Sequence, residues 1–80
     1  MSKTKLTLAD LKRGETATVV AIEANGVTRQ RLLDFGFRPG EVIKVIRLAP
    51  LADPIALTIR GGHISLRRSG AALVTVEKTS

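Results

Sequence analysis

Apolar and polar side chains alternate through two neighbouring segments in the second half of the chain. Residues 54–60 and 63–67 both carry an aliphatic side chain at every second position, which is typical of half-buried β-strands. Gly61-Gly62 lies between them and predicts the tight turn of a β-hairpin. The residues expected to point inward are Ile55, Leu57, Ile59, Ile64 and Leu66.

Three further segments, 16–24, 41–49 and 73–77, are rich in β-branched and aliphatic residues and predict strands. The first of them does not alternate strictly, so it is either covered on both faces or bulged. Residues 68–72 break the alternation and predict a single helical turn. Residues 6–12 form an apolar lead-in, and its expected buried anchors are Leu6, Leu8 and Leu11.

Residues 27–35 predict the one substantial helix. Gly36 suits the left-handed residue that ends a helix, and Phe37 would then pack back on Leu32. Pro39-Gly40 predicts a type II turn, because glycine tolerates the positive φ of the second central position.

The side chains of this helix are compatible with two roles, covering the core alone or also contacting a partner. If it only covers the core, Leu32 and Phe35 face inward, Arg29 faces water, and Leu33 is partly covered. If it also docks a partner, Arg29, Arg31 and Leu33 form the docking face.

Five short strands joined by frequent turns predict a small barrel or sandwich. A barrel is favoured because closing a sheet removes exposed strand edges. At 80 residues, positions 1–80 form one domain, and residues 1–5 and 78–80 are expected to be flexible.

Composition excludes several classes of protein. Cysteine is absent, which rules out disulfides and thiolate metal sites and fits a reducing compartment. No apolar run approaches the roughly 20 residues that a membrane-spanning helix needs. No apolar signal-peptide core follows the basic first residues, so we expect a soluble, cytoplasmic protein.

A net charge of +6 makes nucleic acid a possible partner. Against this, the chain has no Trp or Tyr and only two phenylalanines, whereas single-strand binders usually offer aromatic stacking platforms. Acidic protein surfaces or anionic lipid headgroups fit the charge at least as well.

Catalytic and metal-binding patterns are missing from the sequence. His63 is the lone histidine and is expected to lie exposed beside a turn. Ser65 and Ser69 lack the spaced acid–base partners of a nucleophile, and no phosphate-binding glycine loop is present. We therefore expect no enzyme activity, no cofactor and no resident metal.

The connection between the second and third predicted strands is stiff. Pro50 and Pro54 each fix φ near −65°, and each restricts the residue before it. Leu51 would stand exposed on this loop, beside Asp53. A rigid loop with an exposed leucine suits contact with a partner, because it loses little entropy on binding.

Taken in order, four short motifs resemble the FeoA family, small cytosolic proteins of bacterial ferrous iron uptake. The resemblance covers nearly the whole chain, from Leu6 to Val76. The motifs are Leu8…Leu11…Gly14, Arg31-Leu32-Leu33-Asp34-Phe35-Gly36-Phe37-Arg38-Pro39-Gly40, Ala49-Pro50-Leu51-Ala52-Asp53-Pro54, and Ile64-Ser65-Leu66-Arg67…Ala71.

This resemblance implies an SH3-like five-stranded β-barrel with a short helix between strands 1 and 2. It also implies a non-catalytic accessory role at FeoB, a membrane Fe²⁺ transporter with a cytosolic GTP-binding domain, to which the protein would be recruited at the inner face of the membrane. Two positions depart from the family pattern: Ala52 replaces a usual glycine, and Gly70 replaces a frequent acid.

The expected partner contacts combine the helix and the stiff loop. They are Arg31, Leu33, Pro50, Leu51, Asp53 and Pro54. Self-association stays open, as does an arginine-finger role for Arg29 or Arg31 on the GTPase. The alternatives are a small basic barrel that binds RNA or DNA, and the regulatory domain of an iron-responsive repressor.

Overall fold

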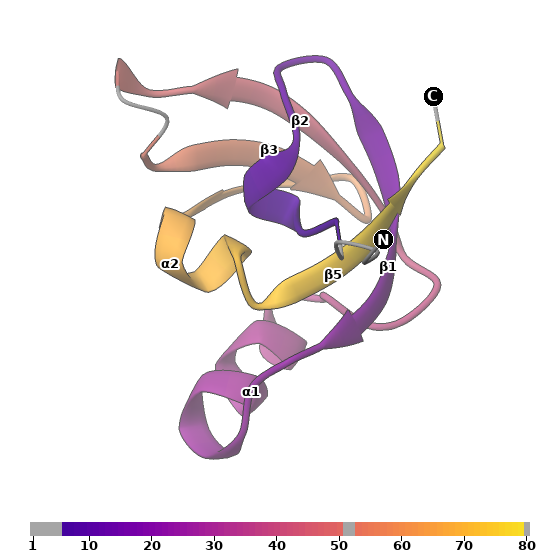
Figure 1. Cartoon of the computed structure of the whole chain (residues 1–80), viewed down its shortest axis with the longest axis vertical. Coiled ribbons are helices and arrows are strands. Elements are labelled where there is room, and N and C mark those ends of the chain that lie inside the picture. The colour runs from indigo at the N-terminus through magenta and orange to yellow at the C-terminus, as the bar shows by residue number, and fades with distance from the viewer. Residues whose placement is uncertain (1–5, 51–52, 80) are drawn as a thin grey trace, which may run out of the picture.

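The computed structural model describes residues 6–50 and 53–79 of the chain (Figure 1). Leu51 and Ala52 lie outside the described residues, as do residues 1–5, for which flexibility was expected. Lys78 is the last residue of its strand, and the Thr79 amide donates to the Thr16 carbonyl at 3.0 Å.

One antiparallel sheet forms the body of the protein, with its strands hydrogen-bonded in the order β4-β3-β2-β1-β5. The sheet curls around the core, which confirms the predicted SH3-like barrel (Figure 1). In the described part of the chain β4 and β5 are the edge strands, and the lead-in covers part of β5 through a bridge between Thr7 and Thr75. The strands are β1 (Thr16–Ile22), β2 (Val42–Leu48), β3 (Ile55–Ile59), β4 (Gly62–Leu66) and β5 (Val74–Lys78).

The β3–β4 hairpin turns one residue earlier than predicted. Ile59 pairs with Gly62, so the two turn residues are Arg60 and Gly61 rather than Gly61 and Gly62. Both have positive φ, 52° and 81°, as a type I′ turn requires. Arg60 tolerates this unusual conformation while its guanidinium lies 3.1 Å from the Glu41 carboxylate.

The irregular pattern of the first strand corresponds to a bulge. The pairing of β1 with β5 shifts register between Val19 and Ala21, so the expectation of a bulged or doubly covered strand is met by the bulge. A second register shift lies between Val45 and Arg47, where β2 pairs with β3.

The described part of the chain has three helical segments: η1 (Leu8–Asp10) precedes β1, α1 (Gly26–Asp34) connects β1 to β2, and α2 (Arg68–Ala71) connects β4 to β5. The predicted end of α1 is confirmed, because Gly36 has φ 104° and its amide donates to the Leu33 carbonyl, while the Phe37 amide donates to the Leu32 carbonyl. Gly40 has φ 97°, as predicted for a type II turn.

The core contains the predicted inward residues of β3, together with Leu66 of β4 and the lead-in anchors Leu8 and Leu11, while Leu6 and Ile64 are partly buried against it. Leu32 and Phe37 are also buried there. The prediction that Phe35 faces the core is wrong, since its side chain is 42% exposed. Within residues 6–50 and 53–79, no helix is long and apolar enough to cross a membrane.

Candidate functional site

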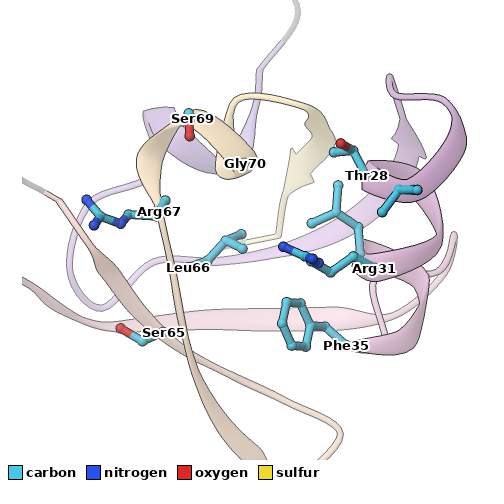
Figure 2. A pocket seen from close by; sticks show the side chains of 10 residues that line it. Thr28, Arg31, Phe35, Ser65, Leu66, Arg67, Ser69 and Gly70 are labelled. Atoms are coloured by element: carbon cyan, nitrogen blue, oxygen red, sulfur yellow. The ribbon is translucent and has the colours of Figure 1, made fainter.

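A groove of about 410 Å³ separates α1 from the segment that runs from the end of β4 into α2 (Figure 2). One wall comes from residues 27–35 and the other from residues 65–70, much later in the sequence. The lining residues are Val27, Thr28, Arg31, Leu32, Phe35, Ser65, Leu66, Arg67, Ser69 and Gly70.

The apolar part of the groove has a buried base and an exposed rim. Leu32 and Leu66 are 3% and 7% exposed and belong to the core. Phe35 and Val27 are 42% and 76% exposed and offer apolar surface to solvent. Large exposed apolar side chains gathered at one concavity are typical of an interaction site.

Two arginines supply the charge of the groove. Arg31 extends from α1 into the groove, towards Leu66, and Arg67 lies on the opposite side (Figure 2). The side chain of Arg31 has no hydrogen bond or ion pair within the described part of the chain. The Arg67 guanidinium lies 4.0 Å from the Asp53 carboxylate and is 79% exposed, so this ion pair is weak. No acid is among the lining residues.

Three hydroxyl groups, those of Thr28, Ser65 and Ser69, complete the lining. They can donate to a carboxylate or to peptide carbonyls and accept from peptide amides. The groove therefore combines apolar contact, positive charge and neutral hydrogen-bonding groups.

Asp53 links the stiff loop to the second wall of the groove. Its carboxylate accepts a hydrogen bond from the backbone amide of Arg68 at 3.0 Å, at the start of α2. The side chain thus serves a tertiary contact within the protein, in addition to the weak ion pair with Arg67.

The predicted contact residues are distributed over two parts of the molecule. Arg31 lines the groove, whereas Leu33 on the same helix is half-buried and does not line it. Pro50 is exposed, and Pro54 lines a smaller cavity of about 160 Å³ with Arg47, Ala49, Ala56 and Ser65. In Figure 1, α1 lies at one end of the long axis, and the adjoining ends of β2 and β3 lie towards the other.

Sequence reasoning missed Phe35, Val27 and Arg67. The spacing of Leu32 and Phe35 indicated a shared buried face, but the turn at Gly36 gives the inward position to Phe37. That turn motif was recognisable in the sequence, and it was the available signal that Phe35 lies outside. No local signal places Arg67 opposite Arg31.

Metal and acid–base chemistry find no support in the described residues. Across residues 6–50 and 53–79, no three His, Cys, Asp or Glu side chains lie together as a metal site would require. His63 is exposed on β4 and does not line the groove. The arrangement can bind a ligand, but it presents no nucleophile paired with a base.

Comparison with known proteins shows which domain family the sequence resembles. Residues 6–78 match the profile of the FeoA domain family. A Porphyromonas gingivalis protein, a fusion of Fe²⁺ transport protein A with the Fe²⁺ transporter FeoB, is 42% identical over 73 residues. The match covers 91% of this chain but only 9% of that protein.

Solved structures agree with the sequence match. The solution structure of FeoA from Chlorobium tepidum has a TM-score of 0.85 and 37% identity, over 94% of this chain and 71% of that one. The zinc-complexed FeoA of Stenotrophomonas maltophilia, described as a prokaryotic SH3 domain protein, has a TM-score of 0.80 and 28% identity, over 90% and 89% of the two chains.

Proposed function

Since the chain belongs to the FeoA domain family, we propose that it is a non-catalytic accessory protein that binds the cytosolic region of a FeoB-type transporter. In this role it supports or regulates Fe²⁺ uptake, with the iron as cargo of the transporter. It acts in the cytoplasm, at the inner face of the membrane where the transporter lies.

The observation that carries this proposal is the fusion relative. In that protein a domain 42% identical to this chain is joined to the transporter in one polypeptide. Fusion holds two domains at a high effective concentration, an advantage when the domains act on each other.

The contact residues of this complex remain the predicted set, divided between two surfaces. Arg31 and Leu33 belong to α1, and Pro50, Leu51, Asp53 and Pro54 belong to the β2–β3 connection. A partner that touched both surfaces would have to extend along the molecule, because α1 and the described ends of that connection lie apart (Figure 1).

Isothermal titration of the 80-residue protein into the purified cytosolic region of the cognate transporter tests the proposal. We expect saturable binding in the micromolar range, measured with and without a GTP analogue. Because the net charge of +6 favours non-specific attraction, the titration is repeated at about 0.3 M salt, where exposed charges are largely screened. Absence of binding in both nucleotide states would refute the proposal.

A further inference from the structure

We propose that the groove between α1 and α2 binds a short segment of the transporter's cytosolic region that carries an apolar side chain next to one or more carboxylates. This inference rests on the proposed function and specifies its recognition site. It moves the centre of the interface from the stiff loop to Phe35, Arg31 and Arg67.

The apolar half of the ligand follows from the shape and lining of the groove. A volume of about 410 Å³ is within the range of sites that hold small ligands or side chains. On the α1 side, Phe35 and Val27 are exposed and Leu32 is buried. Leu66 lies across from Phe35 and Arg31 (Figure 2). A leucine or phenylalanine of the partner placed here would cover apolar surface that now faces water.

The acidic half of the ligand follows from the unpaired charge. Arg31 has no ion-pair partner in the described part of the chain, and Arg67 has only the long contact to Asp53. Guanidinium groups bind carboxylates through two parallel hydrogen bonds, which become stronger as water is excluded. A carboxylate near the apolar anchor would be close to Arg31, with no acid among the lining residues to repel it.

A second copy of this chain fits the groove poorly. Each copy carries a net charge of +6, and a symmetric contact would place the arginines of one groove against those of the other. An acidic segment of another protein compensates this charge, so the observations favour a hetero-complex.

Four variants of the 80-residue protein test the groove against the transporter's cytosolic region. Phe35→Ala and Arg31→Glu alter it. Arg38→Glu is the matched charge control, exposed on the turn that follows α1 and outside the lining, and Val42→Ala is the matched apolar control, 55% exposed on β2. Circular dichroism establishes that each variant is folded, and Arg31→Gln replaces Arg31→Glu if that variant is not.

We expect Phe35→Ala and Arg31→Glu to weaken binding about tenfold or more, and the two controls to stay within about twofold of wild type. Overlapping 15-residue peptides that tile the cytosolic region should identify one segment that binds. Replacing its Asp and Glu by Asn and Gln should reduce its affinity to a similar extent.

Each other outcome decides against the inference. If the cytosolic region binds and both groove variants bind like wild type, the groove is not the site although the proposed function stands. If the region does not bind wild type, the proposed function fails and takes the groove assignment with it. If the protein instead self-associates, and Phe35→Ala abolishes this, the groove serves a second copy.

Discussion

The two walls of the groove are held in place by different forces. The α1 wall is anchored by apolar burial, since Leu32 and Phe37 lie in the core on either side of the turn at Gly36. The α2 wall is anchored at its two ends by the buried Leu66 and Ala71, and in addition the Arg68 amide donates a hydrogen bond to the carboxylate of Asp53, fifteen residues earlier.

This difference shows how a small domain can present a defined surface. The α1 wall is anchored by residues close together in the sequence, so it should persist whenever the core is formed. The α2 wall also depends on the hydrogen bond between Asp53 and Arg68, which joins distant segments. A single hydrogen bond of this kind contributes only about 1 kcal/mol to the stability of the folded state. We therefore expect the α2 wall to open first under mild destabilisation.

The largest loss of stability is expected from a substitution at the α1 wall. Phe37→Ala removes a fully buried ring and should lower the free energy of unfolding by about 3–5 kcal/mol. Phe35→Ala, two residues away but 42% exposed, should cost no more than about 1 kcal/mol. Urea denaturation of both variants measures the contrast, and equal losses would contradict the assignment of the two rings.

The turn between those rings gives the next largest effect. Gly36→Ala places a side chain at φ 104° and should cost about 1–2 kcal/mol. Its Cβ would meet Arg60 Cδ at 3.5 Å and Ile59 Cδ1 at 3.8 Å, which are ordinary contacts, so the cost is conformational.

Gly70→Ala is the matched control for that substitution. Gly70 lies in α2, its φ is not positive, and the new Cβ would stand 3.4 Å from Leu66 Cδ1. We expect this variant to unfold at the same or a slightly higher urea concentration. A Gly36→Ala variant as stable as Gly70→Ala would show that no strain exists at the turn.

Substitutions at the α2 wall should lower the free energy of unfolding by a smaller amount. Asp53→Ala removes the acceptor of the Arg68 amide and should cost about 1 kcal/mol, with faster hydrogen exchange at that amide. Asp53→Asn keeps an acceptor oxygen and loses only the weak ion pair with Arg67, so it should stay close to wild type. If both variants lose the same free energy of unfolding, the charge of Asp53 rather than its hydrogen bond stabilises the α2 wall.

The smallest effect is expected far from both walls, where β1 begins. The Glu15 carboxylate accepts a hydrogen bond from the Lys12 amide at 2.7 Å and lies 2.9 Å from Lys78 Nζ. These contacts, the backbone hydrogen bond first, lower the pKa of Glu15. A lowered pKa in the folded state stabilises the protein above the ordinary glutamate pKa and ceases to do so as the pH falls through the folded value.

Glu15→Gln should therefore melt at a slightly lower temperature than wild type at pH 7. The difference should shrink below the ordinary glutamate pKa of about 4.3 and vanish at lower pH. Melting curves of both proteins between pH 7 and pH 3 measure this dependence. A difference that does not change with pH would assign the effect to packing.

Much of the fold could be predicted because its signals are local. Alternation over 54–60 gave the buried face of β3, and Gly36 with Phe37 gave the end of α1. The hairpin turn was misplaced by one residue because both Gly61 and Gly62 permit a turn. The pairing of Ile59 with Gly62 decides the register, and it forces a positive φ on Arg60.

The groove could be predicted only in part. Arg31 was expected on a docking face, and it does line the groove. The opposite wall, Ser65 to Gly70, is brought there by the path of the sheet and by the bond from Asp53, neither of which has a local sequence signal. The exposure of Phe35, in contrast, had a local signal, because the turn at Gly36 gives the inward position to Phe37.

Because its walls come from residues 27–35 and 65–70, the groove exists only once both segments are folded together. Any ligand of the groove is thus thermodynamically linked to folding of the whole domain. A ligand present at 100 times its Kd would add about 2.7 kcal/mol to the stability of the folded state. A thermal melt would then report occupancy of this site directly, even for a partner that produces no other signal.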